Sequence, residues 1–265
     1  MSQLMQGKKG IIFGVGNKHS IAYGIAKHLH EQGASLAFTY AGEVMEKRVR
    51  PIADSFGSTF VLPCDVTKDH EIDHVFRTYQ QEIGQLDFIV HSVAYAKGDE
   101  LEGDFSDTSR DGFSLALDIS AYSLIPMAKW GKKLMPNGGS ILALTYLGGE
   151  RSVPFYNVMG VAKAALESSV RYLAAELGKQ QIRVNALSAG PIKTLAGKGI
   201  HGFDILLKVN KVRAPLNRNI TLDEVGKSGL YLLSDLSTAV TGETHHVDCG
   251  AHCIALCPED AKLVE

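Results

Sequence analysis

The sequence predicts one α/β domain built around a parallel, doubly wound sheet, and three observations lead to this prediction. The chain of 265 residues is within the range of a single unit of this class. Short apolar runs alternate with longer segments of helical periodicity, as in consecutive βαβ units. Most of the short runs carry apolar residues at successive positions, which is typical of strands that are buried on both faces. We therefore expect residues 1–265 to form a single domain.

Seven apolar runs fit strands, and six amphipathic segments between them fit helices. The expected strands are residues 10–13, 36–40, 60–64, 86–91, 140–145, 182–187 and 244–247. The expected helices are residues 21–32, 43–56, 69–83, 110–134, 157–178 and 222–233. In a doubly wound sheet, ligands bind beyond the carboxyl ends of the strands. The segments that directly follow the strands are therefore the places to look for functional residues.

Composition and charge exclude several classes of function. The formal net charge is −2, and the charged residues are spread along the chain without the basic patch of a nucleic-acid-binding protein. The first ten residues lack the apolar stretch of a signal peptide. No apolar run reaches the length that spans a bilayer. We therefore expect a cytoplasmic protein with no nucleic-acid partner and no membrane partner.

Cysteine and histidine residues gather near the carboxyl end of the sequence, so a metal site has to be considered. They are Cys249, Cys253 and Cys257, with His245, His246 and His252 among them. The gaps between these cysteines differ from the paired C-x2-C pattern of structural zinc sites. Free cysteine often packs as a small apolar side chain. We therefore expect reduced thiols and no metal site, and the same interpretation applies to the isolated Cys64.

The first expected strand is followed by a glycine turn and an amphipathic helix, as in a dinucleotide-binding fold of the Rossmann type. Gly14 and Gly16 would let the backbone approach a pyrophosphate. Ser20 can cap the helix, whose N-terminus favours an anion. The spacing departs from the usual G-x-G-x-x-G, because four residues separate Gly16 from Ile21. On this turn alone, a plain strand–helix connection remains an open alternative.

The tip of the second expected strand bears on the choice of cofactor. An acidic residue there would bind the adenosine ribose of NAD, and an arginine would accept the 2′-phosphate of NADP. The tip reads Tyr40-Ala41 and carries neither, although Lys47 and Arg48 follow within two turns. Because no basic residue occupies the tip itself, we expect NADH as the cofactor, with NADPH as the alternative.

The third expected strand is followed by Asp65 and Val66. Asp65 could hydrogen-bond the adenine amino group, with Val66 beside the ring. A cap on the following turn explains Asp65 equally well, and both roles can hold at once.

The most informative stretch begins at Tyr146 and runs into the long helix expected at 157–178. Tyr156 and Lys163 are seven residues apart, close to two turns of 3.6 residues, so they share one face if the helix extends back to Tyr156. They would be separated by about 10 Å along the helix axis. Both long side chains could then reach one ligand. For an isolated residue, a packed tyrosine or a solvated lysine is the more common role, so the context decides.

This stretch resembles the short-chain dehydrogenase/reductase superfamily, with one departure. That superfamily usually has Tyr-x3-Lys, whereas here Met159 stands four residues before Lys163 and the tyrosine lies at position 156. Tyr-x6-Lys, with Tyr146 ten residues earlier, is similar to the arrangement of bacterial enoyl-acyl-carrier-protein reductases, the divergent branch of the superfamily. Four stretches agree with this resemblance: SIAYGIAK from residue 20, HSVAYA from 91, YNVMGVAKAALE from 156 and RVNALSAGPIKTLA from 183. It extends from about residue 5 to about residue 255.

The resemblance implies an NADH-dependent reductase of the last step of the bacterial fatty acid elongation cycle. Such an enzyme reduces the carbon–carbon double bond of a trans-2-enoyl thioester on acyl carrier protein by hydride transfer. Tyr156 would stabilise the enolate oxygen, and Lys163 would hold the nicotinamide ribose. Tyr146 would shape the acyl pocket or support Tyr156. The resemblance also implies a homotetramer, for which the long apolar helices offer surfaces.

The resemblance assigns further residues to the cofactor and to the substrate. Those expected at the cofactor are Gly14, Ser20, Ile21, Ala41, Asp65, Val66, Ser92, Val93, Lys163, Ile192, Thr194 and Ala196. Those expected at the substrate are Ala96, Tyr146 and Tyr156. The family often has a polar amide near position 41, so Ala41 predicts different adenosine contacts. A segment at about 192–212, which contains three glycines, is expected to cover the acyl site as a lid.

Two other functions compete with this interpretation. A ketoreductase or alcohol dehydrogenase of the main superfamily would use Tyr-x3-Lys, and Met159 argues against it. A dinucleotide-binding sensor without catalytic activity would not need Tyr156 and Lys163 together.

Overall fold

The computed structural model describes residues 3–194, 197 and 202–256, and it contains one seven-stranded sheet. The strands are β1 (Lys9–Phe13), β2 (Ser35–Tyr40), β3 (Val61–Pro63), β4 (Phe88–His91), β5 (Gly139–Thr145), β6 (Ile182–Ala189) and β7 (Thr244–Val247). All are parallel, in the order β3-β2-β1-β4-β5-β6-β7. The order reverses direction between β1 and β4, and ligands of doubly wound sheets bind at such a switch point. The predicted fold class is confirmed.

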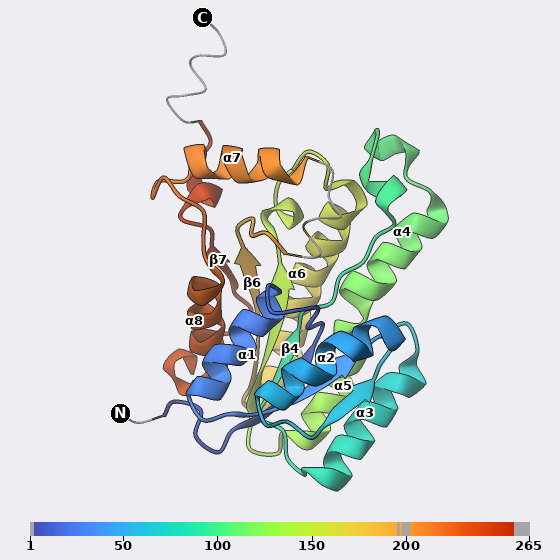
Figure 1. Ribbon diagram of the computed structural model, residues 1–265, viewed down its shortest axis with the longest axis vertical. Helices are drawn as coiled ribbons and strands as arrows, with labels where there is room; N and C mark the ends of the chain where they lie inside the picture. Colours follow the sequence, from blue (N-terminus) through green and yellow to red (C-terminus); the bar gives the residue numbers. More distant parts are fainter. Residues whose placement is uncertain (1–2, 195–196, 198–201, 257–265) are drawn as a thin grey trace, which may run out of the picture.

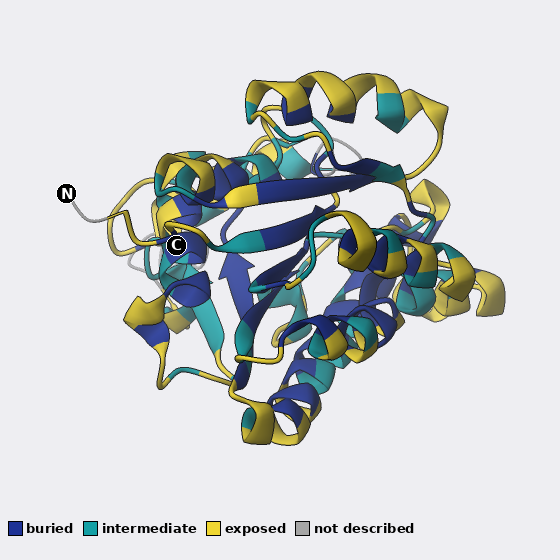
Figure 2. Cartoon of the chain, turned by 90° about the horizontal axis from the view of Figure 1, so that it is seen from below, coloured by how far each residue is buried: buried dark blue, intermediate teal, exposed yellow. Residues whose placement is uncertain are grey.

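Helices cover both faces of the sheet, as Figures 1 and 2 show. They are α1 (Ile21–Glu31), α2 (Glu43–Ser55), α3 (Asp69–Glu82), α4 (Arg110–Leu117), α5 (Leu124–Leu134), α6 (Asn157–Leu177), α7 (Phe203–Arg213) and α8 (Leu222–Leu233). Buried side chains of α1, α2 and α8 pack in one core, and those of α3, α5 and α6 pack in another. The sheet therefore lies between two helical layers.

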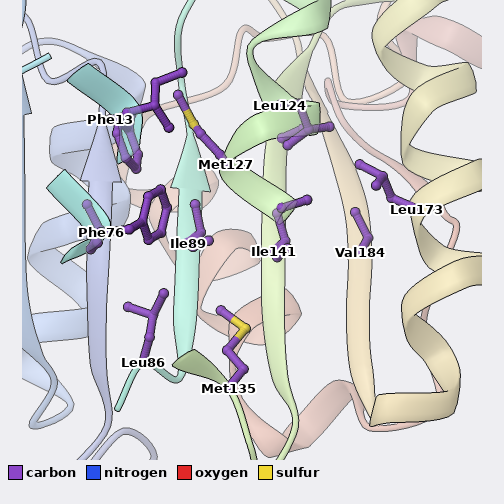
Figure 3. Packing of buried hydrophobic residues seen from close by; sticks show 14 of the residues in the cluster. Phe13, Phe76, Leu86, Ile89, Leu124, Met127, Met135, Ile141, Leu173 and Val184 are labelled. Carbon is purple, nitrogen blue, oxygen red and sulfur yellow. The ribbon is translucent and has the colours of Figure 1, made fainter. Parts of the chain in front are cut away.

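Successive residues of the central strands alternate between the two cores. In β1, Ile11 and Phe13 belong to the core beneath α3, α5 and α6, whereas Ile12 belongs to the opposite one. All three are fully buried. Figure 3 shows the core beneath α3, α5 and α6, in which Phe13 lies near Phe76 of α3. Burial on both faces explains the continuous apolar runs of the sequence, because neither side of a central strand meets water.

One expected helix is interrupted, and one helix was not expected. The segment predicted as a single helix over 110–134 consists of α4, a π-helical turn at Asp118–Tyr122, and α5. In this turn the hydroxyl of Ser123 donates to the carbonyl of Ile119 (2.7 Å) and pairs with the ring of His91 in β4 (2.8 Å). The interruption thus coincides with a tertiary contact to another element, which helical periodicity does not report.

The unexpected helix is α7, which lies within the segment predicted as a lid over 192–212. It crosses the end of the molecule toward which the parallel strands point (Figure 1). Among the described residues of α7 none is buried. Its amphipathic pattern is therefore weak, and this is why periodicity did not reveal it.

Among the described residues, no helix combines the length and the apolar character that a bilayer crossing requires.

Candidate active site

The carboxyl ends of β1 and β4 meet closely at the switch point. Gly14 follows β1 with a φ of +91°, which L side chains rarely adopt. A Cβ atom at this position would overlap the carbonyl oxygen of Ser92, the residue after β4. The amide of Ser92 donates to the carbonyl of Phe13 (3.1 Å). The two backbones therefore approach each other with no side chain between Gly14 and Ser92. They form part of the floor of the site.

The N-terminus of α1 opens beside this floor. Ser20 is its N-cap, and its hydroxyl accepts from the amide of Tyr23 (3.3 Å) and donates to the carbonyl of Asn17 (2.8 Å). The helix begins at Ile21, as the sequence predicts. Unpaired amides at a helix N-terminus favour an anion, and the pyrophosphate of a dinucleotide is such a group.

The tip of β2 has a neighbour that the sequence pattern does not indicate. Ala41 lies exposed directly after the strand, as expected. The structure also brings an arginine there, because the guanidinium of Arg50 in α2 lies over the ring of Tyr40, 5.6 Å from its centroid. Glu46 pairs with Arg50 at 2.6 Å. The strand tip itself carries no basic residue, as expected, and the arginine that reaches it from α2 is already paired with a carboxylate.

Asp65 caps the turn that follows β3. Its Oδ1 accepts from the amide (3.1 Å) and from the hydroxyl (2.8 Å) of Thr67, and Lys68 pairs with its Oδ2 at 3.2 Å. Val66 is buried beside it. The capping interpretation of Asp65 is therefore confirmed, while contact with adenine remains a prediction.

Tyr156 and Lys163 are both buried near the carboxyl end of β5. The helix α6 begins at Asn157 and carries Lys163, whereas Tyr156 is its N-cap and lies just outside it, so a shared helix face remains a prediction. Tyr156 is 7% exposed and Lys163 is 4% exposed. Phe155 and Asn157, which flank Tyr156, both have positive φ values (+64° and +34°). Such backbone strain in residues other than glycine is concentrated at functional sites.

The ammonium group of Lys163 lies in an unusual environment. It donates to the carbonyl of Leu144 in β5 (2.7 Å). Burial lowers its pKa to about 8, and the negative charge of Glu167 opposes this change. A lysine with this pKa is still mostly a cation at neutral pH. Lys163 can therefore offer charged N–H donors to a ligand.

The phenol of Tyr156 remains a proton donor across the physiological range. Its pKa is raised, first by burial and then by Tyr146 and Glu167. The ring of Tyr146 meets that of Tyr156 edge to face, with centroids 4.9 Å apart at 71°. This geometry is a favourable aromatic pairing. The structure is thus consistent with Tyr146 as a support for Tyr156.

An apolar wall adjoins Tyr156. It consists of Leu101, Ala116, Val158 and Met159, with Ala96, Tyr146 and Val153 packed against them. Ala96 was expected at the substrate, and the structure places it here. Leu101 was not expected in this wall, because it lies more than fifty residues from Tyr156 and belongs to no motif.

The remaining predicted residues follow β4 and β6. Val93 is half-buried after β4, and Ile192 is half-buried after β6, so both lie near the carboxyl edge of the sheet. The hydroxyl of Thr194 accepts from the amide of Gly197 (2.9 Å). Ala196, which was expected at the cofactor, and Gly199, which belongs to the segment expected as a lid, lie outside the described residues.

The cysteine residues that the structure describes are free thiols, and the histidine residues of the carboxyl end contact other side chains. Cys64 is buried, Cys249 is half-buried and Cys253 is exposed, and all three are free thiols. His246 stacks on His252, with centroids 4.1 Å apart, and His252 faces the carboxylate of Asp248 at 3.0 Å. Over the part of the chain that the structure describes, no three potential ligands are grouped as a metal would require. Cys257 lies outside that part.

Comparisons with known proteins agree with this geometry. A family model described as enoyl-(acyl carrier protein) reductase matches residues 14–252. The chain belongs to this reductase family. It is 54% identical to enoyl-[acyl-carrier-protein] reductase [NADH] 1 of Rhizobium meliloti (strain 1021), over 98% of this chain and 96% of that protein. It is also 54% identical to the enzyme of Bacillus cereus named enoyl-[acyl-carrier-protein] reductase [NADH] FabI, over 94% and 98% of the two chains.

Solved structures of the reductase family share the fold. The Bacillus cereus enoyl-acyl carrier protein reductase with NADP+ and indole naphthyridinone has a TM-score of 0.93 and 54% identity, covering 96% of this chain and 99% of that one. The enzyme of Anaplasma phagocytophilum in complex with NAD has a TM-score of 0.93 and 53% identity, covering 97% and 98%. Both dinucleotides are therefore represented among close structural relatives.

Proposed function

We propose that this protein is an enoyl-acyl-carrier-protein reductase that uses NADH. The observation that carries the proposal is the burial of Lys163 on α6 and of Tyr156 at the N-cap of the same helix, where Tyr156 packs against Tyr146, in a chain of this family. Met159, four residues before Lys163, cannot donate a proton, so the tyrosine of a ketoreductase is missing from its usual place. The substrate is a trans-2-enoyl thioester, and its carbon–carbon double bond is reduced.

The switch point fits a dinucleotide. The floor at Gly14 and Ser92 admits close approach by a pyrophosphate, and the capped N-terminus of α1 favours its charge. The ammonium of Lys163 has three donors, so its bond to Leu144 leaves capacity to hold the ribose hydroxyls. When bound, the reduced nicotinamide supplies a hydride to the β-carbon of the enoyl group.

Tyr156 acts on the charge that develops during this transfer. Negative charge appears on the thioester oxygen, and the phenol of Tyr156 donates a hydrogen bond to it. Burial keeps the pKa of this phenol raised, so the donor is protonated. Donors placed in advance at a developing oxyanion are among the strongest contributions to catalysis. The apolar wall at Leu101 and Met159 suits the acyl chain.

The same proposal includes a partner protein, a cellular compartment and an oligomeric state. The thioester is presented by acyl carrier protein, and the reaction takes place in the cytoplasm. The protein acts as a homotetramer, as the resemblance of its sequence implies. NADPH is the alternative reductant, because Arg50 lies at the tip of β2.

The test follows NADH and NADPH absorbance with a short trans-2-enoyl thioester and, in parallel, with a 3-oxoacyl thioester. We expect oxidation of the cofactor with the enoyl substrate. Consumption with the 3-oxoacyl substrate alone would overturn the proposal in favour of a ketoreductase. Cofactor binding without turnover of either substrate would identify a dinucleotide sensor.

A further inference from the structure

A buried carboxyl group lies next to the proposed catalytic pair and has no role in the reaction described above. Glu167 follows Lys163 by four residues on α6, so both side chains lie on the same helix face. Glu167 is 5% exposed. Glutamate is almost never buried to this extent without a partner. Its position therefore calls for an explanation.

The contacts of Glu167 join three segments of the site. The hydroxyl of Thr145, the last residue of β5, donates to its Oε1 (2.6 Å). A Cβ atom at Gly149 would lie 2.6 Å from the same oxygen, so the turn after Tyr146 packs directly on the carboxyl group. At Gly148 a Cβ atom would overlap the ring of Tyr156. The turn is thus held between Glu167 on one side and Tyr156 on the other.

The charges around Glu167 come from several elements. Lys163 and Arg171 belong to α6, Glu150 follows the turn, and His246 belongs to β7. Burial raises the pKa of Glu167, Glu150 acts in the same direction, and the hydrogen bond from Thr145 opposes them, as do Arg171 and His246. Burial lowers the pKa of Lys163, and Glu167 opposes that change. A buried cation without a compensating charge is strongly disfavoured.

We propose that Glu167 is a positioning residue of this site. Its carboxylate holds the turn between β5 and α6 against the helix, and it supplies the negative charge that keeps Lys163 a cation. The proposal rests on the proposed function for the role of Lys163 toward the nicotinamide ribose. Cofactor binding by Lys163 would then depend on a carboxylate that lies one helical turn further along α6.

The test uses the substitution Glu167→Gln in the full-length protein. Glutamine keeps the acceptor for Thr145 and removes the charge, so the turn stays in place while Lys163 loses its compensating carboxylate. NADH affinity and kcat/KM are measured from about pH 6 to about pH 10. We expect the alkaline fall of both to move to lower pH by about one unit, which is a tenfold change in proton affinity. Glu176→Gln, on the exposed face of the same helix, is the matched control and leaves the profile unchanged.

Thr145→Val separates the two roles. It removes the hydrogen bond and leaves the charge, so we expect a lower kcat with the alkaline fall at the wild-type pH. An unshifted profile in folded Glu167→Gln would overturn the charge role. If Glu167→Gln does not fold, Glu167→Asp keeps the charge on a shorter side chain. The proposal then requires that NADH affinity and kcat/KM of this variant fall at the same alkaline pH as in the wild type.

NADH affinity is followed by fluorescence without thioester. NADH binding without reduction of any enoyl substrate would contradict the proposed function. The pH dependence of NADH binding would still decide the role of Glu167.

Discussion

The floor of the site and its cover are built in different ways. The floor consists of the ends of β1, β4 and β5 with the N-cap and first turns of α6, and Tyr156 and Lys163 within it are almost completely buried. The segment that we expect to cover the site includes α7, in which Ile205 is 55% exposed and Val209 is 43% exposed. In the floor, Lys163 donates to the carbonyl of Leu144, and Tyr156 packs edge to face against Tyr146. Those of α7 contribute little to the buried core.

This difference shows in which region the side chains need fixed positions. A donor that stabilises developing charge acts best when its position and protonation are fixed before the reaction. Burial achieves this for Tyr156 and Lys163, because it restricts their conformations and raises or lowers their pKa values. Covering elements are drawn from the weakly packed parts of a protein, since they have to move. The comparison therefore predicts unequal consequences for substitutions in the two regions.

The largest effect is expected in the floor from Tyr156→Phe. The ring keeps its edge-to-face contact with Tyr146 while the donor is lost, so kcat should fall about 10²- to 10³-fold, as for an oxyanion donor. NADH affinity should stay nearly unchanged. Steady-state kinetics and cofactor titration measure both quantities. Tyr146→Phe is the control, and a greater loss there than in Tyr156→Phe would assign the oxyanion donor to Tyr146.

A somewhat smaller effect is expected from Lys163→Ala. Loss of hydrogen bonds from a charged donor costs roughly 1.5–3 kcal/mol each, so NADH affinity should fall about tenfold or more. Fluorescence titration with NADH measures the change. Lys179→Ala, an exposed lysine just beyond the same helix, should leave affinity intact. Wild-type affinity in Lys163→Ala would show that the ribose is held elsewhere.

The smallest effect is expected in the cover. Val209→Ser replaces an exposed apolar side chain of α7, so the free energy of unfolding should change by less than about 0.5 kcal/mol. In the floor, Leu166→Ala removes a side chain of α6 that is fully buried and should cost about 2–5 kcal/mol. Denaturant unfolding compares the two variants. Similar losses in both would mean that α7 is as firmly packed as the floor, which would contradict the comparison.

Much of the architecture could be predicted because it depends on local periodicity. Uninterrupted apolar runs identify strands buried on both faces, and the seven expected strands overlap the observed ones. The long helix that carries Lys163 was likewise expected from its periodicity, although it begins only after Tyr156. By contrast, local periodicity does not indicate that Arg50 folds back over Tyr40, or that Ser123, next to the π-helical turn, pairs with His91.

By itself, then, the sequence determined the seven strands, most of the helices in their order along the chain, and the turn at Gly14. Only the tertiary structure decided that Gly14 meets Ser92 without a side chain between them, that Leu101 adjoins Met159, and that Glu167 stands beneath the turn after Tyr146. The physical reason is that spacing along one helix or strand is set by backbone geometry. Contact and desolvation depend on every segment that packs around a residue, and those segments are distant in the chain.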